Sequence, residues 1–81
     1  MKIIFSPRFL KQYQDAPANV QKAFDKQAKL LLQNLRHPSL RAKKYDEARD
    51  IWQARVTRDW RFYFTIEDNT YYLHTIISHP K

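Results

Sequence analysis

The sequence predicts an α+β fold, in which an N-terminal strand and an antiparallel pair of helices precede a three-stranded antiparallel meander. Both helices are expected to pack on one face of the sheet. Two patterns predict this fold. Apolar residues recur every three or four positions between residues 20 and 35, as on the buried side of a helix. After residue 51 they recur at every second position, as on one face of a strand. The 81 residues have room for one domain, and we assign 1–81 to it.

The first expected elements are a short strand and a short helix. Residues 2–5 (Lys-Ile-Ile-Phe) are typical of a strand. Ser6 followed by Pro7 is a typical helix start, with serine as the N-cap and proline at the first helical position. The helix that they begin carries one apolar stripe, formed by Phe9, Leu10 and Tyr13. Pro17 ends this helix or separates it from the next one.

The second helix has the clearest pattern in the chain. Its apolar side is formed by Val20, Ala23, Phe24, Ala28, Leu31 and Leu35. Lys22, Lys26 and Lys29 fall on the other side. His37-Pro38 is expected to end the helix, because a residue that precedes proline is disfavoured in the α region. The charged residues 39–50 have no regular period, so we expect a connector there.

Three strands are expected after the connector. In the first two, polar residues alternate with an apolar set formed by Trp52, Ala54, Val56, Trp60, Phe62, Phe64 and Ile66. Turns are predicted at Arg58-Asp59 and Asp68-Asn69, the second because asparagine tolerates a left-handed backbone. In the last strand, residues 71–78, the apolar residues Leu73, Ile76 and Ile77 do not all fall at alternate positions. One interpretation is that this strand is covered on both faces.

The sheet face opposite the helices is expected to be basic. Arg55, Arg61 and Tyr63 share the polar parity of their strands, so they should lie together on that face. The net charge of +7 also produces a field that attracts polyanions. Charge alone does not distinguish RNA, DNA and an acidic protein as partners, and a basic protein without a nucleic-acid role stays open. All three partners would bind more weakly as salt rises.

Composition excludes several classes of protein. The chain has no cysteine, which excludes disulfides and zinc–thiolate sites. It has no glycine, which excludes glycine-rich phosphate loops and requires other residues in the turns. No apolar run approaches the ~20 residues that span a bilayer, and the N-terminus lacks the anatomy of a signal peptide. We therefore expect a soluble cytoplasmic protein with no cofactor, no metal, no membrane contact and no small-molecule ligand.

Two stretches carry a resemblance to a known family. Residues 51–66 read Ile-Trp-Gln-Ala-Arg-Val-Thr-Arg-Asp-Trp-Arg-Phe-Tyr-Phe-Thr-Ile, and residues 75–80 read Thr-Ile-Ile-Ser-His-Pro. They resemble the RelE/ParE superfamily of toxins from type II toxin–antitoxin systems. Its members carry a short strand with arginine, a turn, an Arg-aromatic-aliphatic strand, a hairpin and a closing strand that ends near His or Arg. The resemblance covers nearly the whole chain, and residues 51–79 are its specific part.

The resemblance implies a function and a set of partners. RelE-like members cut messenger RNA in the ribosomal A site without a metal, whereas ParE-like members poison DNA gyrase. Members of both kinds are neutralised by an antitoxin. The RelE-like interpretation implies a ribosome-dependent mRNA interferase, an endoribonuclease in which a ribose 2′-hydroxyl attacks the adjacent phosphate. Its partners would be a cognate antitoxin, the ribosome and mRNA. The alternatives are a ParE-like gyrase poison and a non-catalytic basic interaction module.

The resemblance assigns catalytic roles to Arg61 and His79. Arg61 matches the strand arginine that contacts the scissile phosphate, a role that suits a permanently charged group with a two-pronged grip. The alternative is a surface arginine paired with an acid on a neighbouring strand. His79 matches a C-terminal histidine that acts as acid or base in several members. Histidine suits this role, because imidazole titrates near neutral pH. The alternative is a frayed residue near the end of the chain.

Further residues are expected to bind RNA. The basic ones are Arg41, Lys43, Lys44, Arg55, Arg58 and Lys81, and Tyr63 is the candidate for stacking on bases. The run from 41 to 44 could instead be a solvated charge cluster. Asp46 and Glu47 could supply a general base. Trp52 and Trp60 share the apolar parity, so core packing is expected for both. This sequence stops at Lys81, whereas many nuclease members end with a tyrosine or arginine beyond this point, which leaves a weak nuclease, a gyrase-type poison and an inactive relative open.

Overall fold

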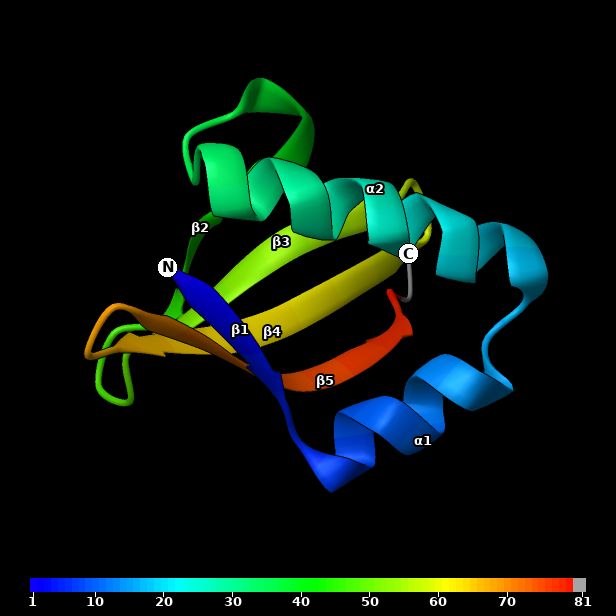
Figure 1. Ribbon diagram of the computed structural model, residues 1–81, viewed down its shortest axis with the longest axis horizontal. Coiled ribbons are helices and arrows are strands. Elements are labelled where there is room, and N and C mark those ends of the chain that lie inside the picture. Colours follow the sequence, from blue (N-terminus) through cyan, green and yellow to red (C-terminus); the bar gives the residue numbers. More distant parts are fainter. Residues whose placement is uncertain (80–81) are drawn as a thin grey trace.

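The computed structural model describes residues 1–79 and confirms the predicted α+β fold (Figure 1). Lys81, one of the expected RNA-binding residues, lies outside the described residues. The helical elements are α1 (Pro7–Asp15), α2 (Ala18–Gln33) and a 3₁₀ turn, η1 (Pro38–Leu40). The strands are β1 (Lys2–Phe5), β2 (Lys43–Asp46), β3 (Ile51–Thr57), β4 (Trp60–Glu67) and β5 (Thr70–Ser78). They form one sheet in the order β1-β5-β4-β3-β2, antiparallel except for the β1–β5 pair.

The core lies between α2 and the central strands. Phe24 of α2 contacts Phe62 of β4 edge to face, with ring centroids 5.4 Å apart. Phe9 of α1 also packs against Phe24, with ring centroids 5.1 Å apart. Burial of one such side chain stabilises a fold by roughly 1.5–3 kcal/mol, and an aromatic pair contributes about 0.5–1.5 kcal/mol more. The predicted apolar side of α2 is confirmed, since Val20, Phe24 and Leu31 are buried.

Helix α1 lies beside β5 and completes its hydrogen bonds (Figure 1). Ser6 is the predicted N-cap: its hydroxyl accepts from the N–H of Phe9 and donates to the carbonyl of His74, both at 3.0 Å. The Oε1 atom of Gln12 accepts from the N–H of Ile76, beyond the point where β1 stops pairing with β5. The predicted apolar stripe of α1 (Phe9, Leu10 and Tyr13) is wrong at Leu10, which is 49% exposed.

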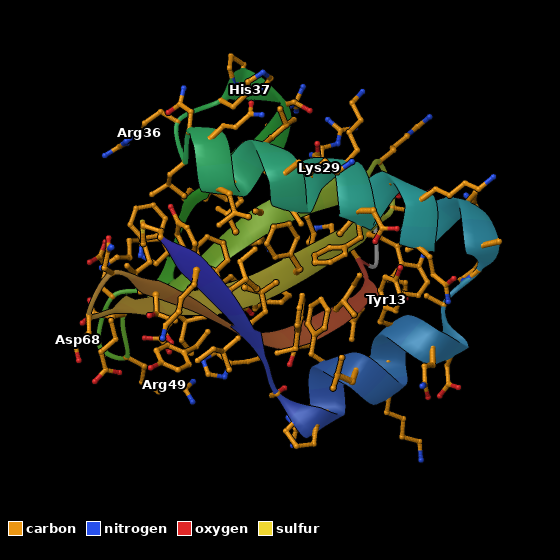
Figure 2. The ribbon with its side chains drawn as sticks, viewed as in Figure 1. Tyr13, Lys29, Arg36, His37, Arg49 and Asp68 are labelled. Carbon is orange, nitrogen blue, oxygen red and sulfur yellow. The ribbon has the colours of Figure 1, made fainter. Side chains whose placement is uncertain are left out.

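The two helices are joined through a side chain. Tyr13 lies between α1 and α2 (Figure 2), and its hydroxyl donates to the carboxylate of Asp25 at 2.8 Å. Within residues 1–79 neither helix is long and apolar enough to cross a membrane.

Helix α2 ends earlier than the sequence predicts. Its last residue is Gln33, four residues before His37-Pro38. Asn34 leaves the helix with an extended backbone (φ −164°), and its side-chain oxygen accepts from the N–H of Arg36 at 3.0 Å. An asparagine side chain that binds its own backbone two residues on competes with the helix, and this ends α2 before the proline acts.

The expected connector contains regular structure, so that prediction is wrong. Residues 38–40 form η1, and residues 43–46 form the edge strand β2, in which Lys43 lies opposite Gln53 and Lys44 opposite Trp52. An edge strand of four mostly charged residues lacks the apolar alternation by which strands are predicted from sequence.

A bulge explains the mixed parity of β5. Tyr63 lies opposite Thr75 while Phe64 lies opposite Leu73, so His74 is an extra residue in β5. The extra residue brings Leu73 and Ile76 to the same buried face although they are three positions apart. The strand is therefore not covered on both faces, and Ile77 is 39% exposed.

Gln27 is one of three buried polar residues among those the structure describes, with Gln53 and Thr70. Gln27 of α2 is 4% exposed, and its amide donates to the carbonyl of Ser39 at 3.0 Å and to the carbonyl of Arg55 at 2.8 Å. Its oxygen accepts from the Ser39 hydroxyl at 3.1 Å. Gln27 therefore ties α2 to η1 and β3.

The β4–β5 turn uses left-handed residues, as predicted. Asp68 and Asn69 have φ values of 48° and 62°, and they connect the paired residues Glu67 and Thr70. A two-residue hairpin turn with both φ values positive favours glycine at its second position.

We expect Asn69→Gly to raise the free energy of unfolding by a few tenths to about 1 kcal/mol, because glycine adopts this conformation without steric cost. Asn69→Val should lower it by about 1–2 kcal/mol. Urea unfolding measures both. Equal midpoints for the two variants would contradict the turn geometry.

We expect Gln27→Met to lower the free energy of unfolding by about 1–3 kcal/mol, because methionine fills a similar volume but leaves the partly buried carbonyls of Ser39 and Arg55 without this donor. The control is Gln33→Met at an exposed position of the same helix, which should change stability by less than about 0.5 kcal/mol. Thermal unfolding of both variants tests this difference.

Candidate nucleic-acid interface

Basic side chains surround a hollow on the sheet face opposite α2. The hollow has a volume of about 480 Å³. It is bordered by Arg41, Lys43, Lys44, Tyr45, Gln53, Arg61 and His79, and we call it the basic hollow. None of these residues is acidic. The catalytic pair expected from the sequence, Arg61 and His79, is thus placed at one site.

Strand alternation puts Arg61 on this face. Ala54 and Phe62 lie opposite each other and are buried, so their neighbours Arg55 and Arg61, which also form a pair, lie on the other face. The Nη1 atom of Arg61 donates to the carbonyls of the β3–β4 turn, at 2.7 Å to Thr57, 2.9 Å to Trp60 and 3.1 Å to Arg58. The guanidinium group is therefore held in one place.

Arg61 has no acidic partner within residues 1–79. The ion pairs found there belong to Lys44 and Arg49, which excludes, for this range, the alternative of an ion-paired surface arginine. Partial burial is the main cause that lowers the pKa of Arg61, and the nearby cation Arg55 lowers it further, with a smaller contribution from Arg41; Tyr63 and Asp59 oppose this shift. An arginine remains charged at neutral pH, so an anion in the basic hollow would relieve this repulsion.

His79 is fixed by its backbone. It follows β5 directly, and its N–H donates to the carbonyl of Asp59 in the β3–β4 turn. The same turn holds Arg61. Arg61 and His79 therefore border one hollow, and both form hydrogen bonds with the same turn.

The remaining cations of the basic hollow are Arg41, Lys43 and Lys44, and of these three only Lys44 belongs to an ion pair within residues 1–79. Arg41 follows η1 in a left-handed conformation with φ 47°, and Lys43 lies on β2. The ammonium group of Lys44 is already bound: it lies 2.7 Å from a carboxylate oxygen of Asp50, and 5.5 Å from the ring centre of Trp52. The hydrogen bond to Asp50 raises the pKa of Lys44.

Three expected residues do not border the basic hollow. Arg58 is exposed in the β3–β4 turn, and Arg55 borders a second hollow instead. Tyr63 accepts a hydrogen bond from Gln53 at 2.9 Å, and its ring packs edge to face against Tyr45 with centroids 5.0 Å apart. Tyr45 borders the basic hollow and was missed by the sequence analysis, where a lone aromatic residue in a charged segment was its only signal.

The expected carboxylates and tryptophans lie elsewhere. Asp46 pairs with Arg49 at 2.8 Å, and hydrogen bonds from Arg49 lower the pKa of Asp46. The side chain of Glu47 is 83% exposed, and neither carboxylate borders the basic hollow. Trp52 stacks on Phe64 with ring centres 6.2 Å apart, as expected for core packing. Among residues 1–79 no three acidic or imidazole groups gather where they could hold a metal ion.

Comparisons with solved structures show the same fold over nearly the whole chain. The YoeB/ParE toxin from Agrobacterium tumefaciens superposes with a TM-score of 0.82 at 13% identity, covering 99% of this chain and 100% of that one. An archaeal RelE from a RelE–RelB complex of Pyrococcus horikoshii OT3 gives 0.81 at 14% identity, with coverages of 99% and 96%. The YoeB dimer from Staphylococcus aureus gives 0.80 at 19% identity, with coverages of 99% and 98%.

The sequence itself matches one family. No curated protein sequence matches it significantly. Residues 3–80 match the family described as "ParE toxin of type II toxin-antitoxin system, parDE". Since the match spans almost all of the 81 residues and the fold is that of RelE and YoeB toxins, the chain belongs to the RelE/ParE superfamily of type II toxin–antitoxin toxins.

Proposed function

We propose that this toxin is a ribosome-dependent, metal-independent endoribonuclease that cleaves messenger RNA in the cytoplasm. The observation that carries the proposal is the basic hollow, in which Arg61 and His79 meet with Arg41 and Lys43 and with no bordering carboxylate. Such a surface suits a sugar–phosphate chain, because cations without acidic partners attract phosphates.

Arg61 is proposed to bind the scissile phosphate. A guanidinium group has five N–H donors, and Nη1 of Arg61 is directed at the carbonyls of the β3–β4 turn. Within residues 1–79 its Nε and Nη2 atoms make no hydrogen bond, so they remain available to two phosphate oxygens. A donor that is fixed before the substrate arrives needs no reorganisation as negative charge develops in the transition state.

His79 is proposed to transfer a proton. In the reaction, the ribose 2′-oxygen bonds to phosphorus, the bond from phosphorus to the 5′-oxygen breaks, and the products are a 2′,3′-cyclic phosphate and a 5′-hydroxyl. One group must accept the 2′ proton and another must donate a proton to the leaving oxygen. A neutral imidazole is suited to the first role, and the ammonium of Lys43 or the phenol of Tyr45 could serve the second.

An antitoxin is the proposed partner that restrains this toxin. The P. horikoshii relative was solved with RelB, and a YoeB of S. aureus was solved with YefM. A segment with carboxylates could occupy the basic hollow and thereby block the same cations that hold RNA. A second candidate function, a gyrase poison, has in its favour only the parDE family description.

We expect expression of the toxin without antitoxin to produce new mRNA 5′ ends within codons of translated messages. Arg61→Ala and His79→Ala should each reduce this cleavage by about 10²–10⁴-fold, because each removes one chemical role. The control is Arg36→Ala, since Arg36 is exposed and points away from the sheet (Figure 2). Growth arrest with intact transcripts would refute the nuclease proposal. Cleaved gyrase–DNA complexes that persist in the Arg61→Ala/His79→Ala variant would favour the gyrase poison.

We expect Arg41→Asn to separate stability from function. A left-handed arginine costs about 1–2 kcal/mol, and asparagine tolerates this conformation better, so the melting temperature should stay the same or rise. RNA binding should weaken, because the basic hollow loses one cation. A fall in melting temperature together with unchanged RNA affinity would show that Arg41 has a structural role instead.

A further inference from the structure

A second hollow lies next to the basic hollow and is also lined by cations. It has a volume of about 450 Å³ and lies between α2, η1 and β3. Lys26, Arg41 and Arg55 border it, and no acidic residue does. Arg41 borders both hollows. None of these three cations belongs to an ion pair within residues 1–79.

The second hollow is held in shape by the buried amide of Gln27. Gln27 borders it together with Ser39, and its hydrogen bonds to Ser39 and to the carbonyl of Arg55 bring α2, η1 and β3 together. Arg41 is held in its left-handed conformation by an N–H bond to the carbonyl of Pro38. Strained residues persist where their surroundings fix them, and such positions are frequent at functional sites.

We propose that the second hollow binds a further phosphate of the same RNA strand, beside the scissile phosphate held at Arg61. The inference rests on the proposed function, which it extends from one phosphate to two. Two cationic hollows that share one arginine suit a ligand whose negative charges repeat along a chain, as they do in a sugar–phosphate backbone. Of the two cations that border only the second hollow, Arg55 was expected from the sequence to bind RNA, whereas Lys26 was assigned no role.

The electrostatics of the two hollows agree with this arrangement. Arg55 and Arg41 both lower the pKa of Arg61, so cations that border the second hollow repel the guanidinium group of the basic hollow. One phosphate would relieve only part of this repulsion. A strand that places one phosphate in each hollow would balance the charges on both sides of Arg41.

The test is RNA binding measured separately from cleavage. The probes are fully 2′-O-methylated oligoribonucleotides, which cannot undergo attack by a 2′-hydroxyl: a pentanucleotide with four phosphates and a dinucleoside monophosphate with one. Fluorescence anisotropy over a series of salt concentrations gives the affinity and its salt slope. For single strands the slope falls by about 0.7 for each phosphate contact that is lost.

We expect Lys26→Gln to weaken binding of the pentanucleotide about two- to fivefold at low salt and to reduce its salt slope by about 0.7. Binding of the dinucleoside monophosphate should not change. The matched control is Lys29→Gln, which removes the same charge from an exposed position of α2 outside both hollows (Figure 2). It should leave both slopes unchanged.

Three results would overturn the second phosphate site. Equal salt slopes for Lys26→Gln and Lys29→Gln would refute the second phosphate site, and the nuclease proposal would stand if the wild-type toxin still cleaves mRNA. Equal affinities of the wild-type toxin for the pentanucleotide and the dinucleoside monophosphate would also refute the second phosphate site. If Lys26→Gln instead weakens binding of a polyglutamate peptide and leaves the pentanucleotide unaffected, the second hollow receives an acidic protein segment and not RNA.

Discussion

The packing of α2 on the centre of the sheet is the constraint on which the other features depend. Phe24 meets Phe62 in that contact, and the alternation of β4 then places Arg61 on the opposite face. A one-residue shift of β4 would move Arg61 beneath the helix and expose an apolar residue. The free energy that stabilises the core therefore also fixes the register of the basic face.

The turn between β3 and β4 links the fold to the chemistry. Its carbonyls accept hydrogen bonds from both the guanidinium group of Arg61 and the N–H of His79, so the two side chains have a common support. Turn carbonyls otherwise need water as a partner, and here the donors are parts of the proposed site. A site built in this way can be rigid without a metal or a disulfide, because backbone groups of one hairpin hold it.

The sequence was sufficient for the existence of α1 and α2, for four of the five strands and for the expectation that Arg61 and His79 lie at one site, because each rests on a local pattern or a quoted motif. It was insufficient where tertiary contacts override the local signal. Strand β2 forms only because β3 offers it a partner, and the bulge at His74 cannot be read from a period of two. Gln27 looks like a surface residue in sequence, and only the carbonyls of η1 and β3 explain its burial. The end of α2 was misplaced because Asn34 binds its own backbone before the proline is reached.

Charge repulsion and backbone strain on the basic face lower the stability of the isolated protein, and binding of an anionic partner would offset that loss. Among the described residues 1–79, Arg41, Arg55 and Arg61 have no ion-pair partner and repel one another, and Arg41 adds a strained backbone at the same place. Anything anionic that binds only the folded chain stabilises it in proportion to the logarithm of its concentration over its dissociation constant. An antitoxin that covers this face and an RNA strand that crosses it would therefore both stabilise the toxin, and through the same cations. Under the proposed function the two would compete for one charged surface, and neutralisation would then need no change in the shape of the toxin, only an acidic segment that occupies the face before RNA reaches it.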